Sequence, residues 1–161
     1  MKKNNRLGFT FPEVIVTISI LLTILGFAAV NLLNVRNSTS LNTVLDLLVS
    51  DIQNQEMKAI SNNTEGRTNT SDYGMYIQTN RYIFFHGSTY NPSESTNVTV
   101  EIDRPLELST TFPNSIVIFS KGTGEISNFV NNQNTISITD TSQNRQKVIT
   151  INRLGVITQI D

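Results

Sequence analysis

The feature that most constrains this chain is an apolar run near its N-terminus. Between Val14 and Leu33 the sequence reads VIVTISILLTILGFAAVNLL and contains no Lys, Arg, Asp or Glu. About twenty predominantly apolar residues are what an α-helix needs to cross the hydrocarbon core of a bilayer. The run therefore predicts a transmembrane segment over about residues 14–33.

Basic residues precede this run, and no acidic residue accompanies them. Lys2, Lys3 and Arg6 are expected to remain on the cytoplasmic side, which places the C-terminal bulk of the chain outside. On hydropathy alone, a plain signal anchor or a secretory signal peptide would also fit. Two further features argue against these simpler interpretations.

The first feature is a processing signal, Leu7-Gly8-Phe9-Thr10, which lies before the apolar run. An ordinary secretory signal is cut after its apolar stretch, at a small-x-small site, whereas cleavage here would leave the helix attached to the chain. The second feature is Glu13, an acid at the edge of the predicted span, where a charged group is costly and usually has a partner.

The order of these motifs resembles the class III leader of type IV prepilins, with residues 1–8 as the leader peptide. The resemblance implies that a prepilin peptidase cuts between Gly8 and Phe9 and methylates the new amine of Phe9. It also makes Glu13 the fifth mature residue, the acid that forms an assembly salt bridge with the N-terminal amine of a neighbouring subunit. Chemically, the amine and the carboxylate can neutralise one another in an apolar environment.

Beyond the apolar run, hydrophobic residues recur at helical spacing. They recur at spacings of three, four and seven: Leu41, Val44, Leu45, Leu48, Val49, Ile52, Ala59 and Ile60. Residues 9–60 therefore predict one long N-terminal α-helix, transmembrane in its first half and amphipathic in its second. The run 61–72 has no aliphatic residue and predicts a solvated linker.

Residues 73–161 read as a β-rich globular head. Thr79-Asn80 is expected to turn a hairpin, and Asn152–Gly155 a second one near the C-terminus. The predicted strands are Tyr73–Gln78, Arg81–Phe85, Val98–Ile102, Ile116–Phe119 and short runs near Ile136, Val148 and Val156. The expected fold class is α+β, with the long N-terminal helix packed on a small antiparallel β-sheet head.

Short motifs in the helix end and the head resemble the H-type minor pseudopilins of type II secretion and the related FimT-type fimbrial proteins. They include Tyr73–Ile77, Tyr82–Phe85, Ile118-Phe119 before Gly122-Thr123-Gly124, and Ile149–Asn152 before Gly155. The resemblance implies a structural subunit of a secretion pseudopilus or a type IV pilus. Its partners would be other pilin subunits, the prepilin peptidase and an inner-membrane assembly platform. The chain would cross the bacterial cytoplasmic membrane once, with its N-terminus inside and its head outside.

The sequence offers little for catalysis. It has no cysteine, and its one histidine, His86, is expected to be an exposed imidazole at a strand end, without a second histidine at metal-binding spacing. Gly122-Thr123-Gly124 lacks the Gly-Lys-Ser/Thr ending of a phosphate-binding loop and reads as a turn. We therefore expect no enzymatic activity, no cofactor and no metal site.

Net charge bears on the choice between two remaining functional classes. Without Lys2, Lys3 and Arg6 the chain carries nine basic against thirteen acidic residues, so the head is net acidic. This favours a subunit that acts through protein contacts. The alternative is a DNA-binding or adhesive minor pilin of a competence or type IV pilus. Its weak candidate DNA contacts are the one basic cluster worth testing: Lys121, Arg145, Lys147 and Arg153.

Overall fold

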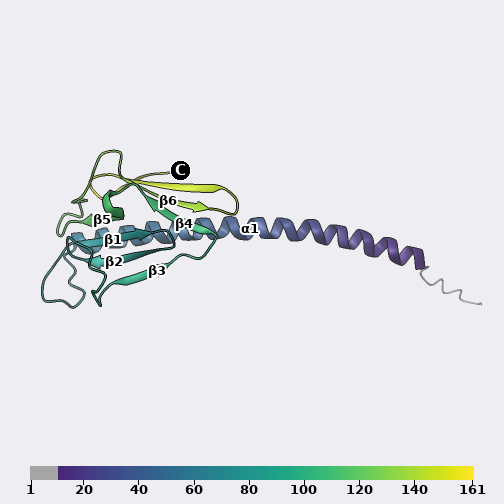
Figure 1. The fold of residues 1–161 in the computed structure, drawn as a ribbon, viewed down its shortest axis with the longest axis horizontal. Helices are drawn as coiled ribbons and strands as arrows, with labels where there is room; N and C mark the ends of the chain where they lie inside the picture. The colour runs from purple at the N-terminus through teal and green to yellow at the C-terminus, as the bar shows by residue number, and fades with distance from the viewer. Residues whose placement is uncertain (1–10) are drawn as a thin grey trace, which may run out of the picture. The chain divides into compact units, whose positions relative to one another are not determined.

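The computed structural model describes residues 11–161, except for the side chains of residues 26–40. The chain divides into two compact units, residues 1–40 and 41–161, and helix α1 (Phe11–Ile60) contributes to both (Figure 1). The second unit, called the head below, contains every described strand. These are β1 (Tyr73–Gln78), β2 (Arg81–His86), β3 (Val98–Glu101), β4 (Leu106–Thr110), β5 (Ile116–Phe119), β6 (Thr135–Asp140), β7 (Arg145–Ile151) and β8 (Ile157–Ile160).

The described helical residues of the first unit, 11–25, are exposed along their whole length. Phe11 is 79% exposed and Leu22 is 64% exposed, and most of their neighbours are aliphatic. No helix among the described residues combines the length and the apolar character that crossing a bilayer requires.

The helical residues of the head, 41–60, have one buried face. The buried positions repeat at intervals of three, four and seven, as one face of an α-helix requires: Leu41, Leu45, Leu48, Ile52, Gln55 and Ala59. The opposite face carries residues such as Asp46 and Gln53, which are exposed. The amphipathic pattern predicted for this part of the chain is confirmed.

The strands form two antiparallel sheets of four strands each, in the orders β3-β2-β1-β5 and β4-β6-β7-β8. The predicted first hairpin is confirmed, because β1 pairs with β2 from Tyr73↔His86 to Gln78↔Arg81. The last hairpin joins β7 to β8, and Gly155 in its turn has a φ of 88°. A residue with a side chain rarely adopts that φ, so glycine suits the position.

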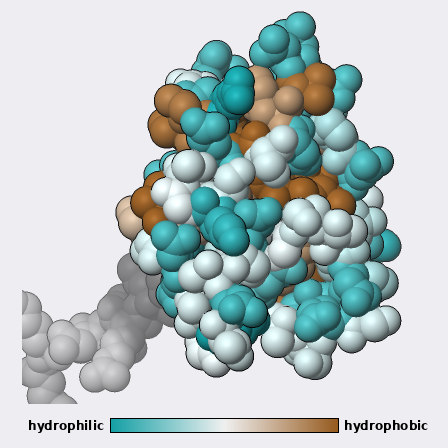
Figure 2. Space-filling view, turned by 90° about the vertical axis from the view of Figure 1, so that its left-hand side faces the viewer, coloured by the Kyte–Doolittle hydropathy of each residue, from teal (hydrophilic) through white to brown (hydrophobic). Residues whose placement is uncertain are grey.

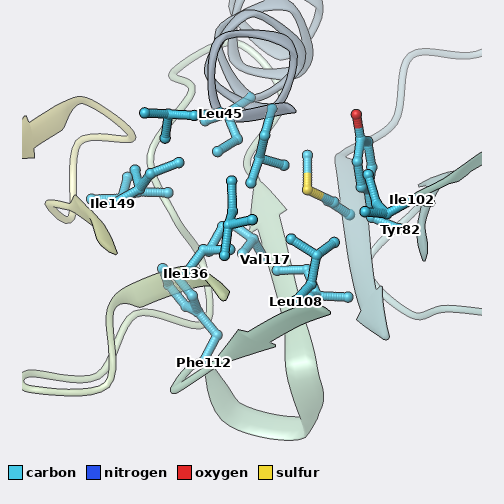
Figure 3. Close-up of a cluster of buried hydrophobic side chains, with 14 of the residues drawn as sticks. Leu45, Tyr82, Ile102, Leu108, Phe112, Val117, Ile136 and Ile149 are labelled. Carbon is cyan, nitrogen blue, oxygen red and sulfur yellow. The ribbon is translucent and has the colours of Figure 1, made fainter. Parts of the chain in front are cut away.

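One hydrophobic core lies between the helical residues 41–60 and the two sheets. Figure 3 shows Leu45 of α1 facing Val117 of the first sheet and Ile136 and Ile149 of the second. Leu48, Ile136 and Ile149 have no exposed surface at all. The backbone N–H of Leu108 in β4 donates to the carbonyl of Thr79 in the β1–β2 turn at 2.7 Å, which ties the two sheets together.

The predicted fold class is therefore wrong. The side chains of α1 are described in two stretches, 11–25 and 41–60, and neither is long and apolar enough to cross a bilayer, so the half-transmembrane helix that was expected is not found among the described residues. The head contains two sheets in place of one small sheet. The physical reason for the second error is that alternation along a strand shows which face is buried but not which strand lies beside it.

Tyr82 and Asp51 form a polar link between the sheet and the helix. The Tyr82 side chain is fully buried, and its hydroxyl donates to Oδ2 of Asp51 at 2.5 Å. Burial and this hydrogen bond to a carboxylate raise the pKa of Tyr82 well above its ordinary value. The hydroxyl therefore stays protonated and keeps donating across the physiological pH range.

We expect Tyr82→Phe to destabilise the head by about 1.5–3 kcal/mol, because the hydrogen bond to a charged group is lost and the ring stays in place. Urea unfolding of the full chain in detergent micelles measures this difference. Tyr76→Phe is the matched control, since the Tyr76 hydroxyl makes no hydrogen bond to any residue that the structure describes. Equal losses in the two variants would contradict the role given to the Tyr82–Asp51 bond.

Candidate functional site

The candidate site at the N-terminal end is built around Glu13. This acid is exposed and lies in the first turn of α1, where the helix dipole favours a negative charge. The predicted cleavage pair, Gly8 and Phe9, lies outside the described residues. The assembly role assigned to Glu13 therefore stays a prediction.

The helix surface that follows Glu13 is almost entirely apolar. Its three hydroxyl side chains turn back onto the backbone: Thr17 donates to the carbonyl of Val14 at 2.9 Å, Ser19 to that of Ile15 at 2.8 Å and Thr23 to that of Ser19 at 2.8 Å. Their polar groups are thus satisfied within the helix, without water or a neighbouring molecule. Residues 11–25 consequently present aliphatic surface with one carboxylate at the beginning.

An exposed apolar surface of this kind is typical of a segment that packs against lipid or protein. Each of the following side chains is at least 40% exposed: Phe11, Val14, Ile15, Val16, Ile18, Ile20, Leu21, Leu22, Ile24 and Leu25. Removing so many aliphatic groups from water is worth about 25 cal/mol for each Å² buried. The stretch therefore has the chemistry of a packing surface.

The structure separates the four candidate DNA contacts into two pairs. Lys121 and Arg153 lie in turns that meet, since the carbonyl of Gly124 lies beside Gly155. Arg145 begins β7 and Lys147 lies two residues into it, about 20 Å and about 13 Å from the strand end that the 152–155 turn follows. Arg145 also pairs with the buried carboxylate of Asp140 at 3.5 Å. The four residues therefore do not form one continuous basic surface.

A second polar cluster lies where the loop after α1 folds back on the head. Glu65 of that loop accepts from Lys58 at 2.6 Å and contacts Nε2 of His86 at 2.8 Å, with Arg67 at 3.7 Å. The His86 side chain is only 11% exposed, and its ring packs edge-on against Tyr73 with 4.7 Å between centroids. His86 is therefore not the exposed strand-end imidazole that the sequence suggested.

Burial is the main influence on the pKa of His86. Together with the charge of Arg67 it outweighs the attraction of Glu65 and lowers that pKa below its ordinary value. The buried Nδ1 atom of the ring has no hydrogen-bond partner among the described residues, which leaves an added proton there unstabilised. Burial alone would raise the pKa of Glu65, but the hydrogen bond and charge of Lys58, aided by His86, bring it below its ordinary value.

These shifts predict how the stability of the head depends on pH. In the unfolded chain His86 binds a proton near pH 6.5, whereas in the folded chain it binds one only at lower pH. Lowering the pH from about 7.5 therefore reduces the free energy of unfolding, until His86 is protonated in both states. Urea midpoints of the full chain should fall over this window. His86→Gln should remove the dependence, because the chain has no other histidine. A slope that persists in the variant would contradict this assignment.

No family match identifies the chain. Comparison with protein-family models, with curated proteins and with solved structures finds no match.

The structure shows no constellation of metal ligands within residues 11–161, where no three His, Cys, Asp or Glu side chains are grouped to hold an ion. Three acids of the head have structural partners. Asp72 accepts from the backbone N–H of Lys121 at 2.9 Å, and Asp140 accepts from Ser142 at 2.6 Å. Glu101 lies 3.5 Å from Arg81.

Proposed function

We propose that the chain is a minor pilin or pseudopilin, a structural subunit of a type II secretion pseudopilus or a type IV pilus. The observation that carries the proposal is the motif order, in which basic residues precede Gly8-Phe9, Glu13 follows, and then comes the apolar run. The exposed aliphatic surface of residues 11–25, with its hydroxyl groups satisfied internally, supports this role because such a surface suits packing among neighbouring helices.

In the proposed mechanism, cleavage after Gly8 creates an α-amine on Phe9. An unperturbed α-amine has a pKa of about 7.7–8 and is largely cationic at neutral pH, and methylation leaves it able to carry the charge. The Glu13 carboxylate of one subunit neutralises the Phe9 amine of its neighbour in apolar surroundings, where either charge alone would be costly. This single ion pair sets the axial register of the incoming helix.

The proposal also assigns a location and partners. The chain is held at the bacterial cytoplasmic membrane before assembly, with Lys2, Lys3 and Arg6 on the inner side and the head on the outer side. Its partners are the prepilin peptidase, other pilin subunits and an inner-membrane assembly platform. Its role is structural and not catalytic. The net acidic head and the separation of Lys121 from Lys147 favour protein contacts over DNA binding.

N-terminal mass spectrometry of the chain from the membrane fraction of a bacterium with an active prepilin peptidase tests the proposal. We expect a mature N-terminus at Phe9 that carries one methyl group. Gly8→Leu should retain residues 1–8, because glycine has no side chain to obstruct a narrow protease subsite. Cleavage beyond Leu33, or an uncut parent chain in such a cell, would overturn the proposed function.

A further inference from the structure

Two glycine turns close over the C-terminal end of α1. A Cβ atom added to Gly155 would lie 2.6 Å from the carbonyl oxygen of Gly124, and one added to Gly124 would lie 2.7 Å from Cγ1 of Ile60. Both glycines have positive φ angles, 73° at Gly124 and 88° at Gly155. The 122–124 and 152–155 turns are therefore packed tightly against each other and against the helix.

Glu56 of α1 lies in the middle of this contact. A Cβ atom added to Gly155 would lie 3.2 Å from the Glu56 carboxylate, and one added to Gly124 would lie 3.2 Å from its Cγ atom. The carboxylate is partly buried, and burial raises the pKa of Glu56 above its ordinary value. It makes no hydrogen bond or ion pair with any described residue.

This arrangement is unfavourable for the isolated head. A negative charge near the C-terminal end of a helix is disfavoured by the helix dipole, and a desolvated carboxylate without a donor costs free energy. Glu65 and Asp140, two other acids of the head, do have donors close by, in Lys58 and Ser142. A cation or a hydrogen-bond donor placed beside the Glu56 carboxylate would therefore stabilise its charged form.

Exposed apolar side chains flank Glu56 and its contacts along the chain. Met57 and Ile60 of α1 are 62% and 40% exposed, and Leu154 and Val156, on either side of Gly155, are 57% and 48% exposed. Figure 2 views the head from the side on which α1 ends, and apolar patches lie there among hydrophilic residues. A partly desolvated charge beside exposed apolar side chains suits an interface that buries a single charged anchor.

We propose that Glu56 and these exposed apolar side chains bind a partner protein through one arginine side chain with an apolar neighbour. The guanidinium donates to the Glu56 carboxylate, and its neighbour packs on Met57 and Leu154. One carboxylate is too few ligands to hold a metal ion, and its negative charge opposes an anionic membrane surface. The proposal does not depend on cleavage at Gly8 or on filament assembly.

The test uses two small peptides and the full chain in neutral detergent micelles. The probe is N-acetyl-leucyl-arginine amide, and its uncharged counterpart carries citrulline in place of arginine. Labelling with ¹⁵N-glycine allows binding to be followed by NMR. The amide signals of Gly124 and Gly155 report on the site, and that of Gly74 in β1 serves as a reference away from it. We expect saturable shifts at the first two glycines only, with a dissociation constant on the order of 1 mM for so small a ligand.

Two variants distinguish binding at Glu56 from nonspecific electrostatic attraction between the peptide and the head. Glu56→Gln should abolish the saturable shifts while the chain stays folded, since it removes an unsatisfied charge. Glu107→Gln, at an exposed glutamate of β4, should bind the peptide as the parent does. Unchanged binding by Glu56→Gln, equal binding of the citrulline peptide, or no saturable shift would overturn the proposal. The proposal would also be overturned if the chain without peptide self-associated and Glu56→Gln did not, because the site would then bind a second copy of the chain.

Discussion

Glu13→Val is expected to be cleaved after Gly8 as efficiently as the parent chain and to be absent from filaments. In the proposed function the peptidase requires residues 1–8 with Gly8, whereas only a packed neighbour requires the charge of Glu13. The variant leaves a Phe9 amine without its carboxylate in apolar surroundings, at a penalty of about 3–5 kcal/mol, the typical cost of removing one member of a buried ion pair. Such a penalty corresponds to a loss of more than a hundredfold in incorporation.

Filaments sheared from cells and probed for the chain measure this loss, and membrane fractions report cleavage and retention. Gly8→Leu is the complementary control, because it should block cleavage while Glu13 remains in place. Glu13→Gln separates charge from shape, and we expect it to fail in assembly as the valine variant does. Recovery of Glu13→Val in filaments at the parental level would show that the ion pair does not drive assembly of this chain.

The second large effect is expected in the core of the head. Leu48→Ala should destabilise it by about 2–5 kcal/mol, because Leu48 is fully buried between the helix and the sheets and the substitution leaves a cavity. Leu47→Ala is the matched control one residue away. Leu47 is 44% exposed, so its truncation should change the stability by no more than about 0.5 kcal/mol.

Urea unfolding of the full chain in detergent, followed by far-ultraviolet circular dichroism, compares the two leucine variants. Because the helix and the strands of the head share one core, Leu48→Ala should shift the unfolding of both together. Unequal shifts, with the helical signal lost first, would mean that residues 41–60 are not part of the cooperative unit. Equal destabilisation by the two substitutions would contradict the buried face assigned to α1.

Several strands and both hairpins were predictable because their signals are local. The pairing of β1 with β2 follows from alternating residues on either side of Thr79-Asn80, and Gly155 marks the last turn. Strand β4 (Leu106–Thr110) was missed, although Leu106 and Leu108 alternate with polar residues there and both are buried. The run is only five residues long and follows Pro105, which is typical of a turn, so its alternation is a weak strand signal.

Long-range contacts explain the errors about polar residues. His86 was expected to be exposed because it stands at a strand end, but the loop after α1 folds back and places Glu65 against it. That loop was expected to be a solvated linker because it has no aliphatic residue. Its contacts are made by Glu65, Arg67 and the carbonyl of Asn63, which accepts from the Tyr73 hydroxyl at 2.5 Å. Composition does not indicate polar contacts of this kind.

The sequence by itself determined the order of basic residues, acid and apolar run, the buried face of residues 41–60 and the places of most strands. These depend on neighbouring residues and on the periods of helix and strand. Only the tertiary structure decided that the strands divide into two sheets, that Lys121 and Lys147 lie apart, and that Glu56 lies unpaired under Gly124 and Gly155. Each of these depends on contacts between residues far apart in the chain, which no local pattern specifies.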